Sequence, residues 1–480
     1  MTSEEIIEKL TQENKKQAET ISRLLETIDE LNQKIKELTE KLKRNSKNSS
    51  QPPSSDGLSK PSPNNHRKSS GKKRGGQIGH PGSHLSTMVD PDEVIKYMPS
   101  DCCECHLKDK CEDIANIDET RYIIDAIVEV KITAHQTLTI DCPLHRRMKR
   151  GAFPDNIKAP VQYGHNLQAL VVSLNTIGAV SVNRTHKILS SVFNIPLSTG
   201  TINGIVSRCA TKLDGVIEYI RERAAASKIV NCDETGTRVN GQTMWVHNAS
   251  NTEYTHLSIH EKRGSEGMEA GGVLPMFFGT AVHDCWAPYW KYDEIKHALC
   301  CAHILRELTG VEENYPEQKW ATAFKKLLLK MKAVKEKGKQ SGKEISRYYL
   351  EKFDSLYDKI IKQAYRKNPK IESTIKKRGR KKKGVVLSLI DRLATYKESI
   401  CLFVNDITVP FDNNQAERDI RMIKTKTKVS GCFRSIEGAR DYLKIMSYIG
   451  TATKQKYNPY EAIRQAILGE PYNIFTKCET

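Results

Sequence analysis

The stretch KIVNCDET, residues 228–235, begins the part of this chain that is expected to form a sheet. Its apolar residues predict a short buried strand that ends in the carboxylate of Asp233, after which Glu-Thr-Gly turns the chain away. A second stretch, FFGTAVHD at residues 277–284, is again an apolar strand that delivers an aspartate, Asp284, at its end. The two carboxylates can meet if their strands are neighbours in one sheet. Further strands are expected at residues 244–246 and 255–259.

A third carboxylate is expected on a helix far downstream. The stretch DNNQAERDIR, residues 412–421, predicts an N-capped helix with Glu417 on its second turn. Asp233, Asp284 and Glu417 together offer the hard oxygen ligands that Mg²⁺ prefers. Two such ions about 4 Å apart activate an attacking oxygen and stabilise the leaving oxygen of an in-line displacement. Each carboxylate alone is better explained as a turn, cap or surface residue, so the inference depends on all three together.

Length and composition exclude several classes of protein. The chain has 480 residues, and at roughly 150 residues per domain it has room for about three domains. An apolar share of 38% supports a sizeable core and excludes a collagen, a mucin or a fully disordered chain. The most apolar stretches are too short to span a membrane, and the acidic N-terminus is not a signal peptide. Thirteen cysteines, an odd number, predict a reduced, cytoplasmic setting.

Positive charge is concentrated in blocks along the chain. The formal net charge is +18, and residues 43–83 carry nine Lys or Arg against one Asp. Residues 45–90 are rich in Pro, Ser and basic residues, which predicts a disordered linker. Arg74 in this linker belongs either to an arm in the DNA minor groove or to a plain tether. The run KKRGRKKK, residues 376–383, adds a second block, and such blocks favour nucleic acid over an anionic membrane surface as partner.

Residues 4–43 have the clearest periodicity in the chain. With Ile7 at heptad position a, the a positions hold Ile, Asn, Ile, Ile, Ile and Leu, and the d positions hold Leu, Gln, Leu, Leu and Leu. Ile at a with Leu at d favours a parallel two-stranded coiled coil, and the Asn fixes its register. Residues 1–44 are therefore expected to form a coiled coil that makes the protein at least a dimer. The alternative is an amphipathic helix packed on its own chain.

Residues 91–150 are expected to form a small zinc-binding module. Cys102 and Cys105 make a C-x2-C pair, and Cys142 and His145 make a C-x2-H pair. Two ligand pairs joined by a hairpin form a tetrahedral, structural Zn²⁺ site like that of a zinc ribbon. Apolar residues alternate between the two pairs, which predicts the strands of the hairpin. Two other cysteines offer alternative ligands, and the basic C-terminal tail of the module is either a phosphate contact or a solvated edge.

Residues 151–227 are expected to be helical. A turn at residues 194–197 follows a helical pattern, and Ser198 or Thr199 caps the next helix. Helix, short turn and capped helix is the order of a helix-turn-helix unit, whose second helix lies in the major groove of DNA. Two helices that only pack together give the same pattern, so both interpretations stay open.

These features together resemble a known family, the DDE transposases of the bacterial insertion-sequence group numbered sixty-six. The resemblance covers nearly the whole chain, including the zipper-like start, the cysteine module, the linker NSKNSSQPPSSDG at residues 45–57 and GGQIGHPG at 75–82. It also covers Asp233-Glu234-Thr235 and His283-Asp284 with Trp286 and Tyr289. The most specific match is NNQAER, residues 413–418, which continues into SGCFRS at residues 430–435.

The resemblance implies an RNase H-like catalytic core at residues 228–455, with a helical insertion at about 315–400 and a C-terminal element at 456–480. It implies that Asp233, Asp284 and Glu417 hold two Mg²⁺ or Mn²⁺ ions and that a zinc finger lies near the cysteine pairs. Within the insertion, one group of residues looks like a DNA-binding AT-hook that lacks the proline usual after its second arginine, and a solvated loop is equally expected. That group consists of Lys376, Arg378 and Arg380.

Two further patterns lie near the carboxylates. Cys300 and His303 form a C-x2-H pair, similar to one in related transposase groups, which either binds metal or, as we prefer, is a helix face in the core. The helix of Glu417 is also expected to carry contacts to DNA phosphates, partly as a ladder at spacings of four, three and four. An ion pair between Arg421 and Glu417 is the alternative. The candidate phosphate contacts are Arg418, Arg421, Lys424 and Lys428.

The residues and the resemblance together predict an α/β DNA transposase that cuts at the ends of its own element and joins the freed 3′ ends to target DNA. The expected partners are the element ends, the target DNA, a second copy of the chain and companion proteins of the same element, with no membrane. The expected location is the bacterial cytoplasm and nucleoid. A catalytically inactive or domesticated dimeric DNA-binding protein is the alternative, and a nuclease without strand transfer is a third possibility.

Overall fold

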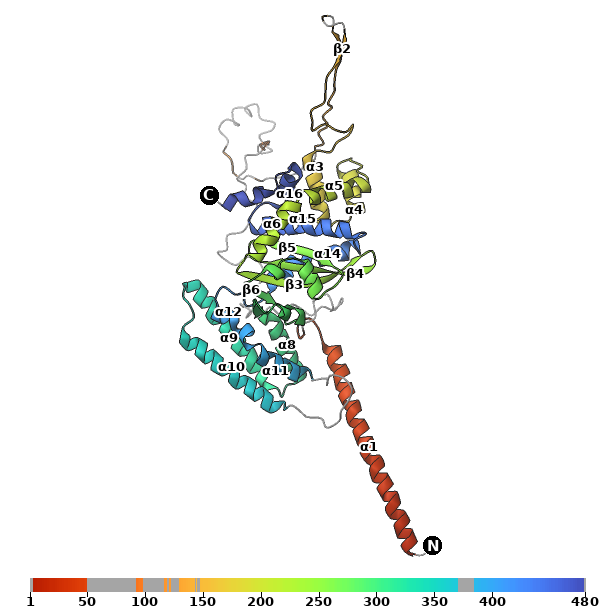
Figure 1. Cartoon of the computed structure of the whole chain (residues 1–480), viewed down its shortest axis with the longest axis vertical. Coiled ribbons are helices and arrows are strands. Elements are labelled where there is room, and N and C mark those ends of the chain that lie inside the picture. Colours follow the sequence, from red (N-terminus) through yellow and green to blue (C-terminus); the bar gives the residue numbers. More distant parts are fainter. Residues whose placement is uncertain are drawn as a thin grey trace. The chain divides into compact units, whose positions relative to one another are not determined.

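The computed structural model of this chain describes residues 3–49, 92–97, 116–118, 121, 129–142, 144, 147–369 and 384–478 (Figure 1). The chain divides into two compact units, one made of Met1–Pro63 with Phe153–Thr480 and the other of Asn64–Ala152. Within the described ranges, no helix is both long enough and apolar enough to cross a lipid bilayer.

The larger unit is built on one five-stranded mixed sheet (Figure 1). From one edge to the other, its strands lie in the order β5-β4-β3-β6-β7. β3, β4 and β5 are antiparallel neighbours, whereas β6 runs parallel to β3 and β7 runs parallel to β6. The α/β class expected from the sequence is therefore confirmed. The strands are β3 (Ile229–Val239), β4 (Gln242–Ser250), β5 (Thr255–His260), β6 (Thr280–His283) and β7 (Lys296–Leu299).

A two-residue hairpin connects β3 to β4. Asn240 and Gly241 have φ values of +46° and +78°, which a type I′ turn requires and which the Asn-Gly pair adopts readily. β3 therefore continues through the Glu-Thr-Gly that follows Asp233, and the expectation that these residues turn the chain away is wrong. The strand does not stop at Asp233 because buried and exposed residues alternate from Thr235 to Val239, which suits an amphipathic strand.

Different helices cover the two faces of the sheet. On one face, Val230, Cys232 and Ala281 share a core with Phe277 and Tyr289. This face is bordered by α7 (Ser265–Ala270), η3 (Leu274–Met276) and η4 (Ala287–Lys291). On the other face, residues of β4 and β5 share a core with α5 and α15, and α15 packs along β5 (Figure 1).

The second core contains helices from both ends of the larger unit. Ser198 is the residue that caps α5, because its side chain accepts a hydrogen bond from the N–H of Thr201. α3 packs against α16, so segments about 290 residues apart in the sequence meet in this core. The helices are α3 (His165–Asn175), α4 (Val182–Val192), α5 (Thr199–Lys212), α6 (Asp214–Ala225), α15 (Ile436–Lys454) and α16 (Pro459–Leu468), with η5 (Pro471–Cys478) after them.

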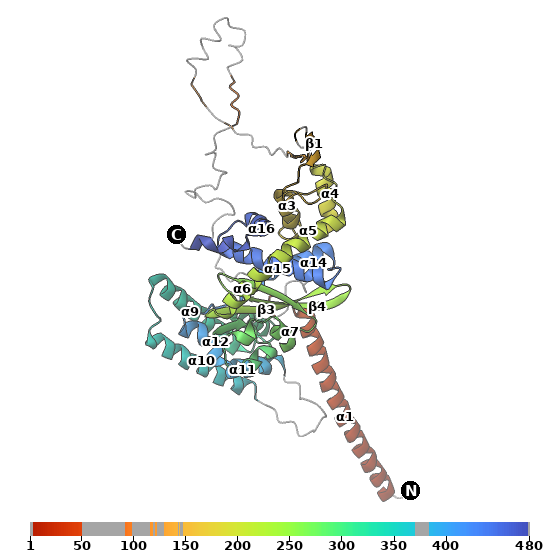
Figure 2. The same ribbon diagram turned by 45° about the horizontal axis from the view of Figure 1, so that its top comes forward.

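A group of helices follows β7 and has its own core. Phe324, Tyr357 and Phe403 are buried in it, and the core continues into the sheet through Val282 and Leu299. Figure 2 shows α9, α10, α11 and α12 gathered together beside the sheet. The helices are α8 (Cys301–Asn314), α9 (Lys319–Ser341), α10 (Arg347–Lys367), α11 (Val385–Thr395) and α12 (Lys397–Asn405), and α13 (Asn414–Asp419) and α14 (Arg421–Ser430) follow them.

The N-terminus forms one uninterrupted helix, α1 (Ser3–Lys43), as the periodicity predicts. Its apolar seam faces solvent in the single chain, with exposed fractions between 51% and 87%. The pairing of this seam with a second copy stays a prediction. The seam residues are Ile7, Leu10, Ile21, Leu24, Ile28, Leu31, Ile35, Leu38 and Leu42.

The smaller unit contains an antiparallel pair, β1 (Thr139–Cys142) and β2 (Arg147–Arg150), and the residues of β2 are exposed. Val130 and Ile132 lie in irregular structure, so the expected strand pattern is wrong for residues 129–138. Backbone pairing with β2 begins only at Thr139. Of the four expected zinc ligands, only the backbone of Cys142 belongs to the described residues, so the zinc site stays a prediction. Cys102, Cys105 and His145 lie outside them.

Candidate active site

Asp233 and Asp284 come from neighbouring parallel strands. β3 pairs with β6 in a register that sets Asn231 opposite Val282. Continuing the register by two residues sets Asp233 opposite Asp284, and a step of two keeps both on the same face as Asn231. β6 ends at His283, so Asp284 follows its C-terminal end directly. The two predicted aspartates therefore come close together, Asp233 on β3 and Asp284 just past the end of β6, and the charge of Asp284 acts on Asp233.

A buried asparagine brings Glu417 to the same face. Asn413, only 2% exposed, accepts a hydrogen bond from the side-chain amide of Asn231 (2.8 Å) and donates one to the carbonyl oxygen of Cys232 (2.7 Å). Its backbone N–H donates to Sγ of Cys300 at 3.2 Å. Because Asn231 and Cys232 directly precede the first aspartate, the start of α13 is fixed beside it, and Glu417 follows one turn later.

The side chain of Asn413, which directly precedes α13, makes no capping hydrogen bond, and Oδ1 of Asp412 accepts from the N–H of Asn414 (3.2 Å) instead. Glu417 lies in the first turn of α13, not in the second as expected. The docking role of Asn413 was not predicted from the sequence. A capping asparagine and one that reaches a distant strand have the same local sequence, so the only available signal was a second asparagine, Asn231, two residues before an aspartate.

Burial and neighbouring carboxylates raise the pKa of Asp233 to about 8. Burial is the largest cause, and the charges of Glu234, Glu417 and Asp284 follow. Burial also raises the pKa of Asp284, which the hydrogen bond from the N–H of Trp286 opposes. The three predicted carboxylates therefore act on one another, and a cation among them relieves their repulsion.

The fourth acidic residue, Glu234, is held by an arginine and a tyrosine. Its Oε1 accepts from Nη2 and Nε of Arg263 at 2.7 Å and 3.0 Å, and its Oε2 accepts from the hydroxyl of Tyr289 at 2.9 Å. The guanidinium of Arg263 also lies over the ring of Trp286, 4.2 Å from its centroid. Glu234 is thus neutralised by a fixed partner, whereas within the described part of the chain Asp233 forms no ion pair.

Glu417 faces α8, the helix that follows β7. Its Oε1 lies 3.7 Å from a terminal guanidinium nitrogen of Arg306 and 3.9 Å from Nε2 of His303. Burial and nearby arginines lower the pKa of His303 to about 3, so the imidazole is neutral at physiological pH. The two side chains of the C-x2-H pair have different surroundings. Sγ of Cys300 is buried and accepts a hydrogen bond from the N–H of Asn413, while His303 faces the carboxylate of Glu417. The preferred interpretation as a core-facing helix fits Cys300 alone.

The expectation of a single helix that carries Glu417 and a basic ladder is wrong. The N–H of Ile423 bonds to the carbonyl oxygen of Ile420, three residues back, so the chain tightens there and divides into α13 and α14. Both isoleucines are buried in the core, which fixes this break. Glu417 and Arg421 belong to different helices, and Glu417 faces Arg306 instead. Of the candidate phosphate contacts, Lys424 is half-buried, and the exposed ones are Arg418, Arg421 and Lys428.

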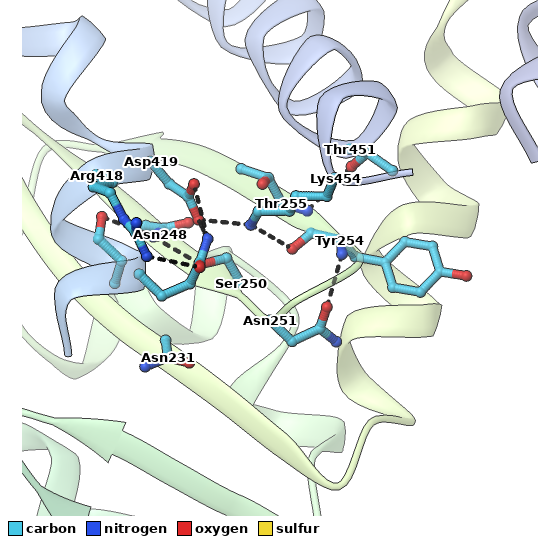
Figure 3. Close-up of polar contacts among 12 residues, drawn as sticks. Asn231, Asn248, Ser250, Asn251, Tyr254, Thr255, Arg418, Asp419, Thr451 and Lys454 are labelled. Atoms are coloured by element: carbon cyan, nitrogen blue, oxygen red, sulfur yellow. Dashed lines mark hydrogen bonds and ion pairs between the residues drawn. The ribbon is translucent and has the colours of Figure 1, made fainter. Parts of the chain in front are cut away.

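The other end of α13 is fastened by a buried ion pair (Figure 3). Oδ2 of Asp419 accepts from Nζ of Lys454 on α15 at 2.7 Å, and each side chain is 11% exposed. The same ammonium donates to the carbonyl oxygen of Tyr254 (3.1 Å), next to the start of β5. Asn248 of β4 donates to the carbonyl oxygen of Ala416 at 3.3 Å. The short helix of Glu417 is therefore held on both sides of that residue.

A known protein family matches the part of the chain that contains these elements. Residues 160–441, more than half of the chain, match a family described as the Transposase IS66 family. This chain belongs to that family. Residues 4–86 match a second family, whose function is unknown, and no curated protein matches the chain. All three predicted carboxylates of this IS66-family member lie within the first match.

The acidic face of the IS66-family protein has the donor chemistry for a hard divalent cation, and Asp233, Asp284 and Glu417 are the groups that would hold it. Within the described ranges, no three side chains of His, Cys, Asp or Glu are gathered closely enough to hold an ion as they stand. A cavity of about 210 Å³ adjoins Asp284, and His303 and Arg392 also line it.

The remaining predicted contacts of the family member with DNA stay predictions, because they fall outside the residues that the structure describes. They are Arg74, Lys376, Arg378 and Arg380.

Proposed function

We propose that this protein is a DNA transposase with an RNase H-like core, which cuts the ends of its element and joins the freed 3′ ends to target DNA. The observation that carries this proposal is the register of β3 and β6, which sets Asp233 beside Asp284 while Asn413 docks the helix of Glu417 against the same strand. The strand order, with three antiparallel strands followed by two parallel ones, supports the RNase H-like assignment.

The chain's own contribution to the reaction is positioning. Asp233, Asp284 and Glu417 would hold two Mg²⁺ or Mn²⁺ ions, which supply an activated attacking oxygen and neutralise charge at the phosphate. In cleavage, water attacks phosphorus and the bond to the 3′ oxygen breaks, which leaves a 3′-hydroxyl and a 5′-phosphate. In strand transfer, that 3′-hydroxyl attacks the phosphorus of a target phosphodiester, and the bond from this phosphorus to the target's 3′ oxygen breaks, which leaves a 3′-hydroxyl on the target strand. Asn413 and Lys454 fix the helix of Glu417, so the backbone that carries this carboxylate is already in place before the reaction.

The segments outside the core serve DNA binding and assembly in this proposal. The apolar seam of α1 pairs two copies in parallel, which supplies two active sites for the two ends of an element. A structural Zn²⁺ at the cysteine pairs orders the small module, and the basic linker and the basic run of the insertion bind DNA phosphates. Companion proteins of the same element are further partners.

A cleavage assay on supercoiled plasmid that carries the DNA flanking this gene tests the proposal. We expect breaks with new 3′ ends at two defined flanking positions when Mg²⁺ is present, and no breaks with Glu417→Gln or Asp233→Ala. Glu437→Gln, at an exposed position on α15, is the matched control and should cut like wild type. DNA binding should stay nearly intact in both active-site variants.

Three outcomes separate the alternatives. Unchanged cleavage by Asp233→Ala overturns the active-site assignment. Binding without breaks favours an inactive DNA-binding relative, unless companion proteins of the element restore cutting. Cleavage without covalent joints between an element end and a new site identifies a nuclease without strand transfer.

A further inference from the structure

Helix α8 presents two side chains to Glu417 that the reaction outlined above does not use. Nε of Arg306 and Nδ1 of His303 are both buried, and neither has a hydrogen-bond partner among the residues that the structure describes. Both side chains are mostly covered, at 19% and 22% exposed. Leaving the buried N–H of Arg306 without a partner costs free energy, so this arrangement favours a ligand that supplies an acceptor, and the neutral ring of His303 has one N–H to donate to such a ligand.

The carboxylate of Glu417 only partly satisfies these donors. Its Oε1 stands 3.7 Å from the guanidinium of Arg306, whereas a full charge-assisted hydrogen bond is about 2.7–2.9 Å long. A phosphodiester offers two non-bridging oxygens in a geometry that suits the fork of a guanidinium. The carboxylate of Glu417 therefore occupies an anion-binding position beside Arg306 without making full hydrogen bonds there.

Two other arginines near the carboxylates have close partners. Arg263 makes two hydrogen bonds to Glu234, and Arg392 forms an ion pair with Glu307. Arg306, by contrast, lies 3.7 Å from Glu417, the residue whose carboxylate a metal would need. His303 lines the cavity beside Asp284 and also faces Glu417, so its side chain borders both.

We propose that Arg306 and His303 form the phosphate-binding subsite of this active site and that Glu417 occupies it in the DNA-free protein. The proposal rests on the transposase function given above. When a DNA phosphodiester takes the place of the carboxylate on Arg306, Glu417 is released toward Asp233 and Asp284. DNA binding then strengthens metal binding, because it frees the carboxylate of Glu417 for the metal. Metal binding likewise strengthens DNA binding, because it frees Arg306 for the phosphate.

The first test measures metal binding without DNA, on the full-length protein. Free Mn²⁺ is followed by electron paramagnetic resonance for wild type, Arg306→Gln, Glu417→Gln and the double variant. We expect Arg306→Gln to bind Mn²⁺ about tenfold more tightly than wild type, within the usual range of coupling between sites. The gain should vanish in the double variant, where the released carboxylate is missing. Arg366→Gln, exposed on α10, is the control.

Equal Mn²⁺ affinity in wild type and Arg306→Gln would overturn the proposal that Arg306 and the metal compete for Glu417. Thermal unfolding checks that Arg306→Gln is folded, and Arg306→Lys, which keeps the charge and loses the fork, gives a second variant with an intermediate effect. This test needs no cleavage, so a wild-type protein that binds Mn²⁺ as expected and cuts no DNA, even with companion proteins of the element added, disproves the proposed function and leaves the ion-pair competition standing.

The second test measures the phosphate contact itself. Wild type and Arg306→Gln bind, in Ca²⁺, a duplex with the natural scissile phosphate or with an uncharged methylphosphonate at that position. We expect wild type to prefer the charged duplex about tenfold, the scale of one charge-assisted contact, and Arg306→Gln to bind the two equally. A preference that survives in Arg306→Gln overturns the subsite, since a purely structural Arg306 would leave the discrimination unchanged.

Discussion

The side chains of Asn231 and Asn413 are joined by a buried hydrogen bond of 2.8 Å, although 182 residues separate them in the chain. The bond connects the strand that carries Asp233 to the helix that carries Glu417. Neither asparagine has a place in the proposed chemistry. The arrangement of the carboxylates therefore depends on an uncharged contact between two segments that meet only in the folded protein.

Replacing Asn413 by alanine should lower both stability and cleavage. The substitution leaves the amide of Asn231 and the carbonyl oxygen of Cys232 buried without their partner, at a cost of about 1–3 kcal/mol for each unsatisfied group. Urea unfolding measures the loss of stability, and cleavage is compared where both proteins are folded. Asn414→Ala, at the exposed next position, should change the free energy of unfolding by less than about 0.5 kcal/mol. Equal stability of the two variants would contradict the docking role.

The buried pair of Asp419 and Lys454 should show strong coupling. Asp419→Ala leaves the ammonium of Lys454 covered with only the carbonyl of Tyr254 as partner, and we expect a cost of about 3–5 kcal/mol. The double variant Asp419→Leu with Lys454→Met should cost less than Asp419→Ala, because it leaves no buried charge. Denaturant unfolding of Asp419→Leu, Lys454→Met and the double variant measures the coupling energy.

An exposed ion pair provides the comparison for this cycle. Arg347 and Glu351 have side chains 91% and 66% exposed, and such surface pairs contribute about 0–1 kcal/mol. Arg347→Ala should therefore have little effect. A coupling energy for Asp419 and Lys454 as small as that of the surface pair would show that the ion pair does not fasten α13.

The sequence predicts those parts of the site that depend on local pattern. An apolar run that ends in Asp233, and a second that ends in Asp284, are visible without a structure because buried strands are short and apolar. The end of β3 was also visible in principle, since Asn240-Gly241 is a strong hairpin signal. The turn was instead predicted directly after Asp233, where the apolar run ends, because the rest of the strand alternates polar and apolar residues.

Long-range contacts account for what the sequence does not predict. Nothing local distinguishes Asn413 as a partner of Asn231, and nothing local shows that Glu417 faces Arg306 and not Arg421. The helix pattern around Ile420 is continuous in sequence, and only the burial of that side chain in the core shows where the chain divides. These features arise from tertiary packing, which overrides local periodicity.

The apolar seam of α1 should hold two chains together. Leu31 is 51% exposed in the single chain, and its burial against a second copy would stabilise a dimer. Removal of residues 1–43, or Leu31→Asp within the seam, should convert the protein to a lower mass in light scattering. Asp29→Lys, exposed and outside the seam, should keep the wild-type mass. An unchanged mass after truncation would contradict the coiled-coil role.

The raised pKa of Asp233 should make stability fall as pH rises. The ordinary pKa of the group is 3.8 and its pKa in the folded protein is about 8, so between these values the folded protein holds a proton that the unfolded chain has lost. The folded state therefore binds more protons, and the free energy of unfolding decreases with pH across this window. Below about pH 4 the carboxyl is protonated in both states, and above about pH 8 the loss is complete.

Melting temperatures of wild type and Asp233→Asn, measured from pH 4 to 9 with a chelator present, test this sign. The difference between them should grow in favour of the variant as pH rises, because the amide cannot ionise among Glu234, Glu417 and Asp284. Added Mg²⁺ should raise the melting temperature of wild type more at pH 9 than at pH 5, since the cation binds the ionised carboxylates. Asp293→Asn, at an exposed position, should follow wild type throughout. Parallel curves for wild type and Asp233→Asn would show that Asp233 ionises as easily in the folded protein as in the unfolded chain.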